Sequence, residues 1–185
     1  DDYVILYSGR NETLVQPLID TFTEQTGITV DIRYAGSSEL AAQLLEEGAD
    51  SPAAVFLSQD AGALGALSLE GLFADLPSEI TDRVNPAFTS YDDSWVGITG
   101  RARVVVYDSE TVSVEQLPTT ADEIVSPQWS GKVAVAPGNA SFQSFVTAYR
   151  VLEGEGAADQ WVAGLTINDP QIFEGNGAIL EAVNQ

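Results

Sequence analysis

In the first quarter of the chain, the pattern of apolar and polar residues changes from that of a strand to that of a helix, and this change occurs twice. Residues 3–7 form a continuous apolar run, which is typical of a strand covered on both faces. From Thr13 the apolar residues recur at helical spacing, and Gly27 is suited to end that helix in a left-handed cap. Residues 28–34 alternate with period two and lead into a second helical pattern near Ser38. The sequence therefore predicts a β-α-β-α unit with parallel strands.

Pro17 limits where the first helix can begin. Its missing N–H is tolerated in the first turn or so, which predicts a helix start close behind Asn11. Further along, residues 53–57 indicate a third buried strand, followed by a helix that ends at Gly71. Residues 78–93 are rich in turn formers, which predicts irregular structure.

The strongest strand pattern of the second half lies at residues 95–107. Its apolar and β-branched residues predict a strand, while Gly97 and Gly100 predict a bend or a change of sheet. We interpret this segment as a hinge between a lobe of residues 1–100 and a lobe of residues 101–185. Period two would place Arg101 and Arg103 on one face. Either this pair binds local carboxylates, or at least Arg101 faces an anion.

The second lobe repeats the strand-loop-helix pattern. Residues 133–136 and 171–173 indicate short strands. Helical patterns begin at Ser141, cover Trp161 and occupy the last residues from Ala178. A capping box at residues 120–123 predicts one more short helix.

Polar side chains stand at five predicted loop-to-helix junctions, three in the first lobe and two in the second. The junctions are Asn11, Ser38, Gln59, Ser141 and Asn176. Each is most simply a helix cap. Together they predict two lobes that face a cleft lined by helix amino ends, where α/β sheets bind ligands and where anions are favoured.

Composition narrows the function classes. The 185 residues are 44% hydrophobic, which is enough for one or two globular domains, and the formal charge is −21. Such acidity argues against nucleic acid or an anionic membrane as partner. Without cysteine or histidine, zinc sites of the usual kind, thiol nucleophiles and Ser-His-Asp triads are excluded. The first residues lack the pattern of a signal peptide, which predicts either a cytoplasmic protein or a mature, processed form.

Five stretches carry a specific combination of motifs. They are residues 6–10 (Leu-Tyr-Ser-Gly-Arg), 35–40, 51–64, 100–107 and 127–132, which includes Trp-Ser-Gly-Lys. In this order they resemble the ferric-iron-binding substrate-binding proteins of bacterial ABC transporters. The resemblance implies a type II periplasmic-binding-protein fold, an α/β fold of two lobes that close on a ligand. It also implies a periplasmic or extracellular lipid-anchored protein that hands Fe(III), held with carbonate or phosphate, to an ABC permease.

The resemblance assigns roles to individual residues. Anion contacts are implied for Arg10, Arg101, Asn139, Ala140, Ser141 and Asn176. Asn11 and Gln59 stand where many members have histidine and glutamate metal ligands. The family's tyrosine pair and the segment that returns to the first lobe would follow Gln185, which implies a chain truncated on its C-terminal side. In that case we expect an incomplete fold, no iron binding in the family's manner, and a dimer or swapped association through unpaired strand edges.

Two alternatives stay open beside this interpretation. The first is a binding protein of the same fold for an oxyanion, a polyamine or thiamine. The second is a carboxylate-based hydrolase in which Asp60 or Glu39 acts as acid or base. Because no two carboxylates have a spacing that indicates a catalytic pair, we expect a binding protein rather than an enzyme.

Overall fold

The computed structural model describes residues 3–185. The chain divides into two compact units, the first ending at Arg101 and the second running from Ala102 to Gln185. This boundary lies one residue beyond the expected one, so that Arg101 belongs to the first unit.

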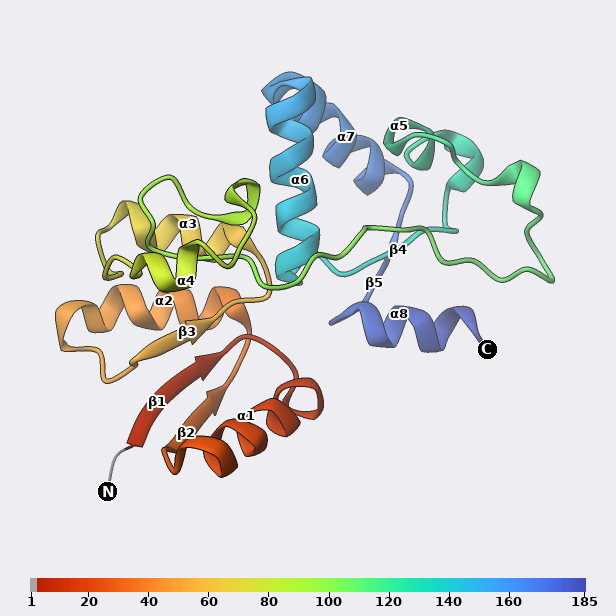
Figure 1. Ribbon diagram of the computed structural model, residues 1–185. Helices are drawn as coiled ribbons and strands as arrows, with labels where there is room; N and C mark the ends of the chain where they lie inside the picture. Colours follow the sequence, from red (N-terminus) through yellow and green to blue (C-terminus); the bar gives the residue numbers. More distant parts are fainter. Residues whose placement is uncertain (1–2) are drawn as a thin grey trace. The chain divides into compact units, whose positions relative to one another are not determined.

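A three-stranded parallel sheet forms the centre of the first unit (Figure 1). Strand β1 (Tyr3–Ser8) lies between β2 (Thr29–Tyr34) and β3 (Val55–Leu57), and Ser8 pairs with both Tyr34 and Leu57. Helix α1 (Glu12–Thr26) connects β1 to β2, and α2 (Ser37–Glu47) with a 3₁₀ turn at Gly48–Asp50 connects β2 to β3. Helix α3 (Ala61–Leu69) follows β3. The predicted β-α-β-α unit with parallel strands is therefore confirmed.

Helix α1 begins directly after Asn11, as Pro17 required. Gly27 ends it with a φ of 73°, and its N–H donates to the carbonyl of Thr23 at 2.8 Å. Pro17 lies in the second turn, just beyond the turn in which a missing N–H costs least. The helix gives up one amino-end hydrogen bond there, and the carbonyl of Pro17 accepts a bond from Thr21 Oγ at 2.8 Å.

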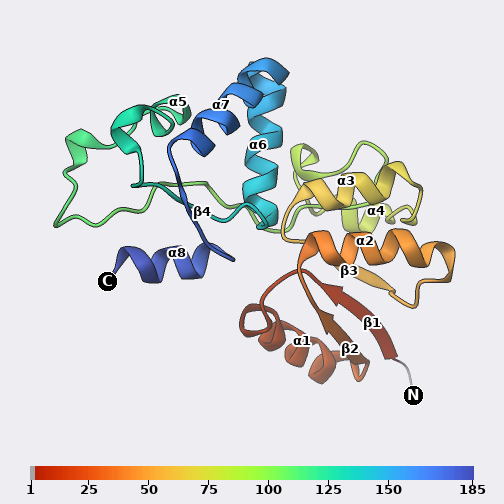
Figure 2. The same ribbon diagram turned by 180° about the vertical axis from the view of Figure 1, so that it is seen from behind.

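The core of the first unit lies between the sheet and the helices α2 and α3. Leu40 and Leu67 have no exposed surface, and they pack with Tyr7, Ala41 and Leu44. Figures 1 and 2 show α1 on the opposite side of the sheet. With a helix on each side, the continuous apolar run of β1 is explained.

The hydroxyl of Tyr7 is part of a polar network at the end of α2. It donates to the carboxylate of Glu47 at 3.0 Å and accepts from Gln43 Nε2 at 3.0 Å, while Ser51 Oγ donates to Glu47 at 2.6 Å. Hydrogen bonds from Ser51 and Gln43 lower the pKa of Glu47, and burial together with the Glu47 bond raises the pKa of Tyr7. Tyr7 therefore stays a neutral, fully bonded phenol.

The rest of the first unit is irregular, as predicted, apart from α4 (Ser78–Thr81) and a 3₁₀ turn at Pro86–Phe88. The strand expected at residues 95–107 is wrong. Within residues 3–185 this segment forms only an isolated antiparallel bridge between Val96 and Thr89. A strand needs a neighbour for its backbone N–H and C=O groups, and β-branched side chains cannot replace one.

Without a strand, the argument from period two fails for the two arginines. Arg101 belongs to the first unit and Arg103 to the second, so they share no strand face. The guanidinium of Arg103 lies 5.7 Å from the ring centroid of Phe145 and 6.0 Å from that of Phe142.

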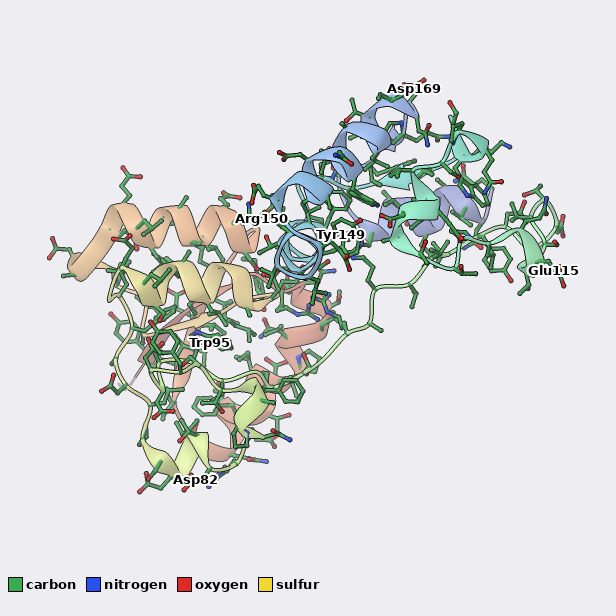
Figure 3. The ribbon with its side chains drawn as sticks, turned by 90° about the horizontal axis from the view of Figure 1, so that it is seen from above. Asp82, Trp95, Glu115, Tyr149, Arg150 and Asp169 are labelled. Atoms are coloured by element: carbon green, nitrogen blue, oxygen red, sulfur yellow. The ribbon has the colours of Figure 1, made fainter. Side chains whose placement is uncertain are left out.

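The second unit contains two parallel strands and four helices, with its side chains drawn in Figure 3. In chain order the elements are a 3₁₀ turn at Val114–Gln116, α5 (Ala121–Ile124), a 3₁₀ turn at Pro127–Trp129, β4 (Ala134–Val135), α6 (Ala140–Glu153), α7 (Glu155–Ile167), β5 (Gln171–Ile172) and α8 (Asn176–Val183). The strands and helices expected here are therefore confirmed, with shorter strands than predicted.

Aromatic side chains form the core of the second unit. Trp161 of α7 is 4% exposed, and it contacts the rings of Phe142, Phe145 and Tyr149 on α6. Its Nε1 donates to the carbonyl of Ala121 at 2.8 Å, which ties α5 to this core. The hydroxyl of Tyr149, labelled in Figure 3, donates to Asp122, and this bond raises the pKa of Tyr149 to about 12.

The capping box predicted at residues 120–123 is half correct. Thr120 Oγ accepts the N–H of Glu123 at 3.3 Å, but the carboxylate of Glu123 accepts the N–H of Thr119, at 2.6 Å, in place of that of Thr120. Across residues 3–185 no helix combines the length and the apolar character that a bilayer crossing requires.

Candidate functional site

Three loops meet at the carboxyl edge of the sheet in the first unit. They follow β1, β2 and β3, and a single buried hydroxyl joins them. Ser37 Oγ accepts the N–H of Gln59 at 2.9 Å and lies 3.4 Å from the carbonyl oxygen of Gly9, to which it donates. Ser37 is 3% exposed, so this connection is shielded from water. At the edge predicted to bind a ligand, the three loops are therefore held together by hydrogen bonds.

Gly9 permits this close approach. A Cβ atom at residue 9 would lie 2.0 Å from Ser37 Oγ and 3.0 Å from Ser37 Cα. The N–H of Gly9 also donates to the carbonyl of Leu57 at 2.8 Å, which holds the first loop against β3. Glycine is needed here for space, since its φ is not among the positive values.

Two guanidinium groups converge on the same edge. Arg101 Nη2 donates to the carbonyl of Gln59 at 2.9 Å, and the backbone N–H of half-buried Arg10 donates to Ser8 Oγ at 3.3 Å. Burial lowers the pKa of Arg10, and the nearby charge of Arg101 lowers it further. Arginine nevertheless stays protonated at neutral pH. The site therefore concentrates positive charge.

No carboxylate neutralises this charge within the described residues. The 28 acidic side chains of the chain far outnumber the 7 basic ones, yet neither Arg10 nor Arg101 forms a salt bridge in residues 3–185. Of the two sequence-based alternatives for Arg101, pairing with a local carboxylate is not observed. Two adjacent like charges repel each other, so an anion that bridges them would relieve an unfavourable interaction.

The two candidate metal ligands lie beside these arginines in the chain. Asn11 is exposed at the amino end of α1 and makes no capping hydrogen bond with its side chain. Gln59 is half-buried, and its backbone carries the bonds to Ser37 and Arg101. Within residues 3–185 no group of three or more acidic side chains is arranged to hold a metal ion. A metal role for Asn11 and Gln59 stays a prediction.

The structure adds two residues that sequence reasoning did not assign to this edge. Ser37 is the first residue of α2, one position before the expected junction at Ser38. Asp60, not Gln59, caps α3, because its Oδ1 accepts the N–H of Gly62 at 2.9 Å. For a place at this edge, the sequence signal was a serine or aspartate before a helical pattern, which predicts a cap. The hydrolase alternative also uses Asp60, as an acid or base.

The remaining candidate residues lie at one edge of the second unit. Helix α6 follows β4 and α8 follows β5, and these strands are parallel, so both helix amino ends are at the carboxyl edge of the pair. Asn139 caps α6, Ala140 is the first residue of α6 and Asn176 is the first residue of α8. The fold thus brings together the part of the candidate set that belongs to this unit.

Asn139 holds the amino end of α6 with its side chain. Its Oδ1 accepts the N–H of Ser141 at 3.1 Å and the hydroxyl of Ser141 at 2.6 Å. We expect Asn139→Ala to lower the free energy of unfolding by about 1 kcal/mol, measured by urea denaturation, because a capping bond is lost. Asn176→Ala is the matched control, since α8 is capped by Gly175 without a side-chain bond. An equal loss in both variants would contradict the capping role.

Comparison with known proteins identifies the family of this chain. Residues 17–183 match the model of the bacterial extracellular solute-binding proteins. The chain is 36% identical over 184 residues to the Fe(3+)-binding periplasmic protein of Serratia marcescens, a match that covers 100% of this chain and 54% of that protein. The chain spans about half the length of the curated relatives it matches.

Solved structures agree with these matches. Iron-bound HitA from Pseudomonas aeruginosa is 32% identical with a TM-score of 0.95, over 99% of this chain and 60% of that one. The Trichodesmium protein IdiA (FutA), in complex with iron and citrate, is 31% identical with a TM-score of 0.74, over 94% of this chain and 55% of that one. The fold is that of the type II periplasmic binding proteins, as the resemblance implied. Motifs, topology and all three comparisons agree that the chain belongs to the bacterial extracellular solute-binding proteins.

Proposed function

We propose that this chain is part of an extracytoplasmic protein that captures Fe(III) together with a small oxyanion and delivers it to an ABC permease. The observation that carries the proposal is the pair Arg10 and Arg101, two guanidinium groups at one sheet edge that no carboxylate of residues 3–185 neutralises. Guanidinium groups bind carbonate and phosphate oxygens by charge-assisted hydrogen bonds. The relatives named for ferric iron support the choice of metal.

The anion would join the arginines to the iron. Fe(III) is a hard cation that prefers anionic oxygen ligands. An oxyanion held by Arg10 and Arg101 would offer its remaining oxygens to the metal, which removes the need for many acidic side chains. Asn11 and Gln59 would add neutral amide oxygens from the same loops. We propose carbonate or phosphate as the anion because both have several oxygens on one small centre.

The second unit would supply further donors to the same kind of ligand. Helices α6 and α8 expose N–H groups at their amino ends, and these ends carry partial positive charge. We propose that Asn139, Ala140, Ser141 and Asn176 offer side-chain amides, a hydroxyl and backbone N–H groups to an anion at this edge of the second unit. The caps of α6 and α8 position these groups.

A titration of the 185-residue chain with Fe(III)-citrate, with and without bicarbonate, tests the metal part. Tyrosinate bound to iron would give a visible charge-transfer band. We expect no band from Tyr7, Tyr34 or Tyr149, because their hydroxyls are bonded to Glu47, Gln16 and Asp122. Bicarbonate or phosphate should still bind by calorimetry. A strong band would show that a tyrosine of this chain binds iron, and Tyr→Phe variants would identify which one. Absence of anion binding would contradict the proposal.

The same site also fits a binding protein for an oxyanion alone. The two arginines favour it over a polyamine, because a polycation would be repelled. Two measurements decide between binding of Fe(III) with an anion and binding of an oxyanion alone. If the two ligands are bound together, iron retention depends on the anion and anion affinity depends on iron, since the coupling of two ligands is reciprocal. Self-association through unpaired strand edges is part of the proposal too, and light scattering would detect it.

A further inference from the structure

One carboxylate oxygen at the arginine-lined edge has no hydrogen-bond partner. Asp60 uses its Oδ1 to cap α3. Its Oδ2 is shielded from solvent, and no donor within residues 3–185 reaches it. A buried charged acceptor without a donor is costly, and native proteins rarely leave one unless a ligand or ion satisfies it.

The place of Asp60 in the fold connects this oxygen with the anion site. Asp60 directly follows Gln59, whose carbonyl accepts from Arg101 and whose N–H donates to Ser37. Cation and carboxylate are thus anchored on consecutive residues of one short loop. An oxyanion drawn in by Arg10 and Arg101 would therefore meet the loop that carries this unbonded acceptor.

We propose that Asp60 is a specificity-determining residue that selects oxyanions carrying a proton. Hydrogen phosphate and hydrogen carbonate each have one O–H group that can donate to Oδ2. Sulfate and nitrate have the same charge and shape as their respective counterparts but no proton, so they would set a bare oxygen against the carboxylate. This inference rests on the proposed function, because it assigns a selectivity to the same anion site.

Calorimetry with two matched pairs of anions at mildly alkaline pH tests this selectivity. The probes are sodium phosphate against sodium sulfate, and sodium bicarbonate against sodium nitrate. We expect the protonated member of at least one pair to bind roughly tenfold or more tightly, because a site built to receive an O–H rejects analogues that lack it. The pair with the larger ratio identifies whether phosphate or carbonate chemistry fits the site.

Asp60→Asn is the decisive variant. Asparagine caps helices as well as aspartate, so the fold should persist, while its Nδ2 offers a donor where the carboxylate was an acceptor. We expect the preference for the protonated anion to disappear or to reverse towards sulfate and nitrate. Asp75→Asn makes the same change of charge at an exposed position of the first unit and should leave the ratio unchanged.

Two failures can be told apart. If anions bind and depend on Arg10 and Arg101, but both members of each pair bind equally or Asp60→Asn keeps the ratio, the selectivity is overturned and the anion site stands. If neither member of any pair binds to the unsubstituted chain, both the proposed function and the selectivity are refuted.

Discussion

The double substitution Arg10→Gln with Arg101→Gln should weaken the binding of inorganic phosphate or bicarbonate by about a hundredfold. Each guanidinium would contribute a charge-assisted hydrogen bond, and losing two such bonds at about 1.5 kcal/mol each removes about two orders of magnitude in affinity. Isothermal titration calorimetry at constant ionic strength measures this loss. Each single variant should retain part of the affinity.

Arg83→Gln is the control for this experiment. Arg83 is an exposed arginine of the same unit, so its substitution changes the net charge as much as each single substitution at the site and leaves the sheet edge intact. In a chain of formal charge −21, long-range attraction of anions by any one arginine is small. If Arg83→Gln weakened anion binding as much as a single substitution at the site, the affinity would reflect overall charge and not a local site.

Gly9→Ala should destabilise the first unit by about 2 kcal/mol or more. Its Cβ would lie 2.0 Å from Ser37 Oγ and 2.9 Å from Ser37 Cβ, so Ser37 must move and its bond to Gln59 must lengthen or break. Overpacking of a closely fitted position costs about 1–3 kcal/mol, and loss of the buried hydroxyl's bonds adds to it. Thermal and urea denaturation followed by circular dichroism measure the effect.

Gly65→Ala provides the comparison for that substitution. Gly65 lies inside α3, and an added Cβ there would meet no atom within 4 Å. Because alanine favours helix over glycine by about 1 kcal/mol, this variant should be neutral or slightly more stable. If Gly9→Ala were tolerated as well as Gly65→Ala, the tight joining of the three loops at Ser37 would be refuted. Anion affinity of Gly9→Ala should also fall, since Arg10 lies on the first loop and Arg101 bonds the carbonyl of Gln59 on the third.

The two predictions concern different properties of one site. The arginines supply its charge, and the contact between Gly9 and Ser37 holds the loops on which the charge depends. A site at the carboxyl edge of parallel strands needs both, because loops alone are too mobile to hold like charges together. Loss of stability without loss of anion affinity in Gly9→Ala would separate the two properties.

Local patterns in the sequence determined most of the first unit. The apolar run of β1, the alternation of β2, the start of α1 behind Asn11 and its end at Gly27 are short-range features. Each depends on neighbouring residues, on period or on a backbone angle that glycine accepts. The parallel arrangement then follows from the order of strands and helices, and the five junctions mark the edges where ligands bind in such folds.

Contacts between distant residues were decided only by the tertiary structure. Residues 95–107 have the composition of a strand, yet a strand exists only where another backbone lies beside it, and the sequence does not show its neighbours. The same limit explains why Arg101 and Arg103 separate: Arg101 bonds the carbonyl of Gln59, and the guanidinium of Arg103 lies 5.7 Å from the ring centroid of Phe145. The sequence placed the junctions at Ser38 and Gln59, whereas the fold places the hydroxyl of Ser37 between three loops and leaves one oxygen of Asp60 without a donor. Periodicity and capping depend on neighbouring residues, so the sequence alone predicts them. Contacts between residues that are dozens of positions apart depend on packing, so only the tertiary structure shows them.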